Sequence, residues 1–460
     1  MTDRDIRVAQ GGGPDGFSGT MLQSGDPLYD EARLQFNTMI DKRPALITRC
    51  ASSADIAAAV RYGVERGLEI AVRGGGHSVA GAGVTEGGIV VDLRALNAVR
   101  VDPEARTVRV EGGATGADLD RACEPFGLAT TGGRVSTTGV AGLTLGGGSG
   151  WLERKFGLAS DNLLSVELMT ADGRSVTASE NKNPELFWAL HGGGGNFGVA
   201  TALTFRLHPL PVATLALLFW PAEAGPEVLR CYRDLFDRGA PDELGGALSY
   251  LTGPQEEFLP VHLQDRLLVA AVAVYAGSEA ETRAAFAPLF DLAPEGMFVT
   301  EMPYADLQSA LDAPPGFRNY WSVEHLRELP DQAVELFCAR SADMPTPSPS
   351  QQVVLPWGGA VAQDKDRWPL PYRSATWVVH PFGLWADPVD DERGIAWTRA
   401  LRADVKPWST GDVYLNFIGN EGPERVVAGF GRANYDRLAS IKAEYDPGNV
   451  FHVNHNIVPA

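Results

Sequence analysis

The stretch Arg73–Gly83, RGGGHSVAGAG, decides the fold, because it follows a strand-like run and is too rich in glycine to continue as a helix. Each glycine inside a helix costs about 1 kcal/mol. Gly76-His77-Ser78 is therefore not the nucleophile elbow of a serine hydrolase, which must run into a helix. Successive bare backbone N–H groups instead suit an anion-binding nest that holds a pyrophosphate. His77 is expected beside a bound dinucleotide.

A second glycine cluster, Gly193-x-Gly195-x-x-Gly198, has the spacing of the Rossmann fingerprint. That fingerprint needs a strand before it and a helix after it, so that the helix N-terminus faces the pyrophosphate. Here the helix-like NPELFWAL comes first and the strand-like GVATALTF follows. The cluster therefore favours a tight structural turn, and no GK[ST] follows any glycine run to suggest a Walker A loop.

The composition of the chain limits the kinds of molecule that it is expected to bind. A chain of 460 residues exceeds what one hydrophobic core usually supports, and its formal charge of -19 opposes binding to nucleic acid or to an anionic membrane. The four cysteines lie far apart with no CxxC pair, so neither a zinc site nor a disulfide framework is indicated. The N-terminal residues contain no apolar leader. We expect a cytoplasmic enzyme that is monomeric or homodimeric.

The lengths of the strand-like and helix-like segments change near residue 208. Before it, short strands alternate with a helix over 53–67 and with a hairpin whose tip is Asp172-Gly173; after it come longer strand runs and helices over 280–290 and 391–405. The last forty residues, from VYLNF onward, are expected to return to the first domain. This predicts an α+β fold with three units, which are a cofactor domain over 1–208, a substrate domain over 209–415 and a returning C-terminal segment over 416–460.

Five motifs occur in order along the chain: RGGGHSVAGAG at 73–83, then GGIVVDL, TTGVAGLTLGGGSGWLERKFGLASDNL at 137–163, LFWALHGGGGNFGVAT at 186–201 and YDPGNVFHVNHNI at 445–457. Together they resemble the berberine bridge enzyme-like FAD-linked oxidases, which belong to the vanillyl alcohol oxidase fold group, and in particular a bacterial branch of that family. The resemblance implies a PCMH-type FAD-binding domain of two α+β subdomains and a substrate domain with an antiparallel sheet flanked by helices.

The resemblance implies that His77 carries the 8α-methyl group of FAD. Imidazole is a competent nucleophile toward that methyl group, and the alkylated ring makes the flavin a stronger hydride acceptor. Many relatives attach the flavin a second time, through a cysteine at the position that Val135 occupies here. We therefore expect a single covalent link. The motifs imply the following cofactor contacts: Arg73, Gly74, Gly75, Gly76, Ser78, Val135, Thr137, Thr138, Gly139, Gly142, Gly147, Gly148, Gly150, Asp161, Asn162, Gly198, Val199, Asn416, Asn454 and Asn456.

The resemblance also identifies candidate residues on the substrate side. The family usually supplies a base from a YxN segment, here Tyr414-Leu415-Asn416, and a polar residue five positions before a tryptophan, here His380 before Trp385. The ordinary pKa of histidine, about 6.5, makes His380 an alternative base. Both residues are equally compatible with structural roles. A substrate pocket is expected from aromatic residues in the same half: Tyr320, Trp321, Trp357, Tyr372 and Trp377.

Together these features predict an FAD-dependent oxidase that takes a hydride from a CH–OH or CH–NH group of a small secondary metabolite, aromatic or glycosylated. Dioxygen is the expected acceptor. Thr138 departs from the aliphatic residues that admit or block dioxygen in the family, so a dehydrogenase with another acceptor stays open, as does a redox-silent flavin-binding protein. The HxxH of His452 and His455 is expected to contact the flavin, and no metal is assigned.

Overall fold

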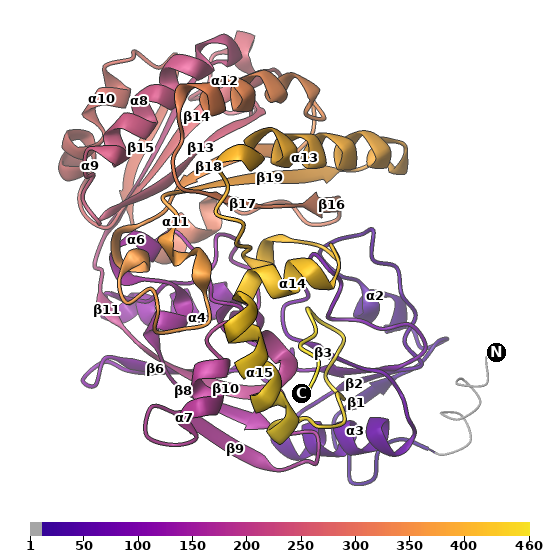
Figure 1. Ribbon diagram of the computed structural model, residues 1–460. Helices are drawn as coiled ribbons and strands as arrows, with labels where there is room; N and C mark the ends of the chain where they lie inside the picture. Colours follow the sequence, from indigo (N-terminus) through magenta and orange to yellow (C-terminus); the bar gives the residue numbers. More distant parts are fainter. Residues whose placement is uncertain (1–11) are drawn as a thin grey trace.

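Three β-sheets organise the protein in the computed structural model, which describes residues 12–460 (Figure 1). The expectation about an N-terminal leader concerns residues that lie largely outside this range. The first sheet has the strand order β1-β2-β4-β3, with β2, β4 and β3 parallel. Its elements are β1 (Thr20–Leu22), α2 (Tyr29–Arg33), β2 (Leu46–Arg49), α3 (Ser53–Glu65), β3 (Ile70–Arg73) and β4 (Ile89–Asp92).

The second sheet is antiparallel and has the order β5-β6-β10-β8-β9. The Asp172-Gly173 turn joins β8 to β9, as the sequence predicts. The elements of this region are β5 (Val99–Asp102), β6 (Thr107–Glu111), α4 (Gly116–Cys123), β7 (Leu128–Ala129), α5 (Val140–Leu145), α6 (Glu153–Phe156), β8 (Leu163–Met169), β9 (Ser175–Ser179), α7 (Pro184–Ala189), β10 (Val199–Arg206) and β11 (His208–Pro209), which pairs with β7.

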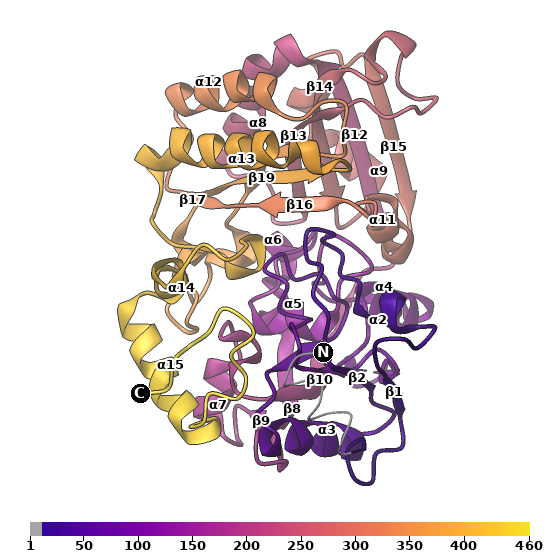
Figure 2. The same cartoon turned by 90° about the vertical axis from the view of Figure 1, so that its right-hand side faces the viewer.

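The third sheet is a large antiparallel sheet of the order β15-β12-β14-β13-β18-β19-β16, with β17 paired to β19. Helices cover one face, and the other face is turned toward the N-terminal half (Figures 1 and 2). The strands are β12 (Ala213–Pro221), β13 (Leu244–Thr252), β14 (Leu267–Tyr275), β15 (Gly296–Met302), β16 (Arg318–Trp321), β17 (Glu324–Leu326), β18 (Gln351–Pro356) and β19 (Trp377–Trp385), and the helices are α8 (Gly225–Asp237), α9 (Glu279–Ala285), α10 (Ala287–Phe290), α11 (Tyr304–Ala310), α12 (Asp331–Arg340) and α13 (Asp391–Val405).

Side chains alternate between the two faces of this sheet, because successive residues of a strand point in opposite directions. In β12, Leu218 and Trp220 are buried in a core with residues of α8 and α12, whereas Leu217 and Phe219 line a cavity on the other side. The alternation separates a stabilising helix-packed face from a face that is free to bind a ligand.

The C-terminal segment, with α14 (Pro423–Phe430) and α15 (Arg432–Tyr445), packs back on the N-terminal half, where α15 lies against α7 (Figure 1). Lys442 is fully buried, and its Nζ donates to the Asn196 side chain at 3.1 Å and to the Phe451 carbonyl at 3.0 Å. Burial lowers the pKa of Lys442 to about 8. A buried lysine is tolerated only with such partners, so this contact fixes the tail against the glycine segment around Asn196.

The α+β architecture predicted from the sequence is confirmed. Helix α3 takes its N-cap from Ser52, whose side chain accepts from the Asp55 N–H. The VYLNF segment forms a 3-10 turn over Leu415–Phe417. Within residues 12–460 we find no helix long and apolar enough to cross a membrane.

Candidate active site

One large cavity lies between the glycine-rich segments of the N-terminal half and the free face of the third sheet. Its volume is about 800 Å³, within the upper part of the range of small-molecule and cofactor sites, roughly 300–1,000 Å³. The wall combines residues from all parts of the chain, from Ile70 to His455. Such a cavity can hold a ligand that reaches from the glycine loops to the sheet.

Glycine residues leave part of the cavity wall without side chains. A Cβ at Gly75 would collide with the backbone nitrogen of Gly139, so these two glycine loops touch. At Gly142, Gly194 and Gly195, all on the cavity wall, a Cβ would meet nothing within 4 Å. Such walls let an extended cofactor approach main-chain N–H groups closely. The residues present therefore fit a dinucleotide.

His77 lies where the first glycine loop meets this cavity. Its ring stacks on Phe36 with centroids 4.2 Å apart, and its Nε2 is 2.8 Å from the Thr137 hydroxyl. Burial, reinforced by the nearby Arg73 guanidinium, lowers the pKa of His77 to about 4. The imidazole is therefore neutral at physiological pH and keeps a nucleophilic nitrogen.

Arg73 lies behind the loop and not on the cavity wall. One of its Nη atoms donates to the Ala32 carbonyl, and a Cβ at Gly76 would lie 3.0 Å from the other. Burial lowers the pKa of Arg73 to about 10, so it remains a cation. The sequence predicted a direct cofactor contact for Arg73. In the structure Arg73 instead packs behind the glycine loop, and its positive charge helps to lower the pKa of His77.

The opposite wall is built by cross-strand ladders on the sheet. One ladder runs through directly paired residues of β12, β14, β13, β18 and β19 and ends at His380. A second ladder runs through β13, β18, β19 and β16 and ends at Trp321. The first ladder consists of Phe219, Ala270, Ser249, Val353 and His380. The second consists of Leu251, Gln351, Phe382 and Trp321. All nine residues line the cavity. Directly opposed residues share a face, so the pairing register alone places His380 at the cavity.

His380 is held in a defined tautomer. Its Nδ1 is 2.8 Å from the Ser322 carbonyl, which can only accept, so Nδ1 carries the proton. The ring stacks on Phe417 at 4.1 Å. Burial lowers the pKa of His380 to about 4, and the ring is neutral near pH 7. Nε2 is consequently the basic atom of a fixed imidazole.

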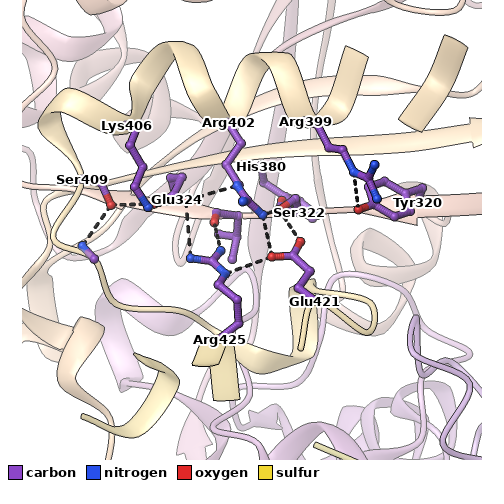
Figure 3. Close-up of polar contacts among 12 residues, drawn as sticks. Tyr320, Ser322, Glu324, His380, Arg399, Arg402, Lys406, Ser409, Glu421 and Arg425 are labelled. Carbon is purple, nitrogen blue, oxygen red and sulfur yellow. Dashed lines mark hydrogen bonds and ion pairs between the residues drawn. The ribbon is translucent and has the colours of Figure 1, made fainter. Parts of the chain in front are cut away.

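A buried charge cluster, consisting of Glu324, Glu421, Arg402 and Arg425, lies behind this histidine (Figure 3). Glu324 is fully buried and lies 3.5 Å from both arginines. Glu421 accepts from Arg402 at 2.6 Å and from Arg425 at 2.9 Å, and also from the Ser322 hydroxyl at 2.8 Å. The exposed ammonium of Lys406 also lies 3.9 Å from Glu324, so three cations surround the two carboxylates, and Ser322 connects the cluster to His380. The cluster thus joins α13 and α14 to the strand region that orients the imidazole.

The C-terminal segment completes the cavity with amide side chains. Asn416 and Asn454 both line it, and the Asn454 Oδ1 is buried without a partner in the described part of the chain. The Asn416 amide donates to the Leu143 carbonyl at 3.0 Å. A buried unpaired oxygen at the wall fits a ligand that supplies a donor.

The structure brings many of the predicted residues to one cavity and leaves others away from it. The predicted residues on the wall are Gly74, Gly75, Gly76, His77, Ser78, Val135, Thr138, Gly139, Gly142, Gly198, Trp321, His380, Asn416 and Asn454. Thr137 approaches only through its hydrogen bond to His77. His455 is also on the wall, whereas His452 contacts Glu69 at 3.5 Å. No group of acidic, histidine and cysteine side chains with metal-site geometry occurs in residues 12–460.

Several predicted cofactor contacts instead have structural roles. Asp161 forms an ion pair with Arg373, and the Asn456 side chain accepts from Lys442. The Asn162 amide donates to the Leu158 carbonyl at 3.0 Å. The remaining residues of this group pack against protein and not against the cavity: Gly147 on Tyr372, Gly148 on Ala159, Gly150 on the Gly132 carbonyl, and Val199 in the core beneath the first sheet.

The expectation that Tyr414 faces the substrate is not met. Its side chain is fully buried, and its hydroxyl oxygen accepts from the N–H groups of Gly148 at 3.1 Å and Ser149 at 2.9 Å and from Asn416 at 3.0 Å. Burial raises the pKa of Tyr414. Tyr414 ties the C-terminal segment to the glycine loop and is not among the residues that line the cavity.

Most of the predicted aromatic pocket lies elsewhere. Tyr320 is adjacent to Trp321 on β16, so it points to the opposite face, where its hydroxyl accepts from Arg399 at 3.2 Å (Figure 3). Trp377 packs among the helices of that face. Trp357 and Tyr372 have ring centroids 6.1 Å apart within the buried core. Only Trp321 of the five reaches the cavity wall.

Sequence reasoning missed several residues of the site. Phe36 supports the wall by stacking on His77 but comes from a segment with no recognisable motif. Leu217 and Phe219, and Gln351 and Val353, are the alternate residues of two strands. The period-2 pattern of those strands was a usable signal, but it does not show which of the two faces is free.

A glycine-lined cofactor cavity beneath an antiparallel sheet defines an FAD-binding oxidoreductase, and comparisons with known proteins agree. Residues 44–179 match the family described as FAD binding domain, and residues 413–458 match the family described as berberine and berberine like. The chain belongs to the berberine bridge enzyme-like FAD-linked oxidoreductases.

Individual relatives support this assignment. The chain is 33% identical to (R)-6-hydroxynicotine oxidase of Paenarthrobacter nicotinovorans, over 91% of this chain and 92% of the relative. It is 29% identical to an uncharacterised FAD-linked oxidoreductase of Bacillus subtilis, over 96% and 99%. The crystal structure of 6-hydroxy-D-nicotine oxidase from Arthrobacter nicotinovorans matches with a TM-score of 0.85 at 28% identity, covering 96% and 98%. A chitooligosaccharide oxidase, at 22% identity and a TM-score of 0.83, covering 96% and 97%, shares the fold.

Proposed function

We propose that this protein carries FAD on His77 through one 8α-histidyl bond and oxidises a CH–OH or CH–NH group of a small organic molecule, with dioxygen as the acceptor. The observation that carries the proposal is the single cavity that contains both the glycine loop of His77 and the imidazole of His380. Val135 occupies the position of the second attachment site in relatives, which supports a single link.

In this proposal some residues hold the cofactor, and another accepts the proton that the substrate loses. His77, kept neutral by burial, supplies the nucleophilic nitrogen, and Thr137 orients its ring. Bound FAD would supply the hydride acceptor. The Nε2 of His380 accepts a hydrogen bond from the O–H or N–H of the substrate and receives its proton as the hydride departs. Nδ1 keeps its own proton and donates it in a hydrogen bond to the Ser322 carbonyl, which holds the ring in this orientation.

The domain assignment belongs to the same proposal. The cofactor domain is residues 1–208 and the substrate domain 209–415, and the segment 416–460 returns to the first. It is supported by the division of strands between the sheets and by the Lys442 anchor of the tail. We further propose a cytoplasmic enzyme, because its charge of -19 gives no attraction to anionic surfaces.

Acid precipitation tests the cofactor bond, because a covalent flavin stays in the pellet. Flavin in the supernatant would contradict the link. For the reaction, the protein is mixed anaerobically with a panel of secondary amines and alcohols, and the flavin absorbance is followed. Bleaching shows oxidation, and rapid recovery in air identifies an oxidase. Slow recovery would assign a dehydrogenase, and no bleaching with any compound would favour a redox-silent flavin protein.

A further inference from the structure

The cavity extends far beyond the part that His77 and His380 border. The ladder that ends at His380 crosses five neighbouring strands to reach Phe219 on β12. Strands lie about 4.8 Å apart, so Phe219 is about 19 Å across the sheet from His380. His77 is at the His380 end, because its partner Phe36 also contacts Trp321 on β16 with ring centroids 6.3 Å apart. The distant end therefore lies away from the histidines.

The sheet side of this distant part is largely apolar. A third ladder joins Phe298, Leu217, Val272 and Ala247 on β15, β12, β14 and β13, and all four line the cavity. Phe298, Leu217 and Val272 remain half-buried although they lie in the interior of a wall. Every member of this ladder is an aliphatic or phenyl side chain. Apolar surface left facing a cavity gains free energy when an apolar ligand covers it.

The loop between β13 and β14 closes the distant end. Its Phe258 ring lies 5.7 Å from Phe219 and 5.4 Å from Phe298. These three phenylalanines form an aromatic end wall, and Glu256, on the same loop, is exposed to solvent. A blind apolar compartment with solvent at its rim accepts one end of a molecule.

The few polar groups in this region do not suit a sugar. The Ser249 hydroxyl already donates to the Tyr250 carbonyl at 3.0 Å, and Gln351, paired with Phe382, is the remaining amide in the ladders. A saccharide carries several hydroxyl groups, each of which costs free energy when it is desolvated without a partner. The lining favours a substrate with one polar end.

We propose that this apolar channel, bounded by Leu217, Phe219, Val272, Phe258 and Phe298, binds an uncharged alkyl or aromatic group of the substrate while the carbon to be oxidised lies at His380. The proposal rests on the proposed function for the position of the reacting carbon. It assigns the substrate to amphipathic, largely apolar amines or alcohols and excludes oligosaccharides.

The test measures binding of inert probes to the flavin-loaded protein by titration calorimetry, which does not depend on redox activity. The probes are 4-n-alkylbenzamides from methyl to pentyl. Each methylene buried in the channel should strengthen binding about fourfold, so the series should span on the order of 100-fold. A disaccharide should bind far more weakly than the pentyl compound. Equal affinity along the series, or tighter binding of the disaccharide, overturns the proposal.

Two variants locate the effect. Val272→Phe fills the channel from a half-buried wall position and should remove the chain-length dependence while the methyl compound binds within about threefold of the parent. Phe298→Ala, in which no added bulk can disturb folding, should weaken the pentyl compound about tenfold and leave the methyl compound unchanged. Val64→Phe makes the same exchange on the exposed surface of α3 and should change neither. An unchanged series in both channel variants would contradict the location.

Failure of the channel and failure of the proposed function have different signatures. A protein that oxidises amines or alcohols but binds all probes equally keeps its function and lacks the channel. If affinity rises along the alkyl series but no compound bleaches the flavin, the channel is supported and the proposed function is contradicted.

Discussion

Replacing His325 by phenylalanine should make the protein markedly less sensitive to acid. His325 is fully buried, and its ring stacks on Tyr372 with centroids 5.0 Å apart. Burial lowers the pKa of His325 to about 3, far below the ordinary value of about 6.5. The folded protein therefore keeps this ring neutral, whereas the unfolded chain protonates it below pH 6.5. Phenylalanine fills a similar volume and binds no proton.

The size of the effect follows from proton linkage. Because the unfolded state binds the extra proton, stability is complete above pH 6.5 and falls as the pH falls toward 3. At pH 5.0 the loss through this one group is about 2 kcal/mol relative to pH 7.5. With an unfolding entropy of about 2.1 cal/mol/K per residue, a chain of 460 residues changes its midpoint by about 1 °C per kcal/mol. The variant should thus lose about 2 °C less than the parent between these pH values.

Thermal unfolding followed by tryptophan fluorescence at pH 7.5 and pH 5.0 measures this difference. The control is His262→Gln, because the His262 side chain is 65% exposed and its contact with Glu295 lies at the surface, where ion pairs contribute little. The control should lose as much stability as the parent. If His325→Phe and the parent lose the same number of degrees on acidification, the burial argument for this histidine is refuted.

Three further predictions concern the charge cluster and the two histidines of the cavity. Glu324→Gln should lower stability by about 3 kcal/mol, since it removes a fully buried carboxylate from two partly buried arginines. Glu279→Gln in an exposed ion pair should cost less than about 0.5 kcal/mol, and equal shifts of the two midpoints would contradict this. His380→Asn should slow anaerobic flavin reduction by roughly 10²–10⁴-fold without releasing flavin, and stopped-flow traces that match the parent would exclude it as the base. Thr137→Val removes the hydrogen bond that orients His77, so acid should release a larger fraction of flavin from freshly loaded protein than from the parent.

The glycine loop around His77 could be located from the sequence because local chemistry determines it. A glycine loop with a histidine needs no knowledge of distant residues, and His77 and Gly139 both line the cavity. The reversed helix and strand order around Gly195 is present as well, with α7 before β10. His380 lines the cavity because the position that the family motif marks is on the free face of β19.

The substrate side was harder because it depends on register. Tyr320 and Trp321 are neighbours in sequence, yet they point to opposite faces of the sheet, and a one-residue difference decides which one lines the cavity. Tyr414 was expected to face the substrate, but it lies at the start of the 3-10 turn over Leu415–Phe417, and its hydroxyl meets the Gly148 and Ser149 amides. Phe36 reaches His77 through a contact between segments that share no sequence pattern.

The covalent flavin on His77 is tested most directly by mass spectrometry of a tryptic digest of the purified protein. Cleavage after Arg73 and Arg94 gives one peptide, residues 74–94, that contains this single histidine. The account predicts that this peptide carries the mass of FAD, or of FMN after hydrolysis, with fragment ions that place it on His77, and that the peptide containing Val135 is unmodified. An unmodified 74–94 peptide from a yellow protein would contradict the central claim.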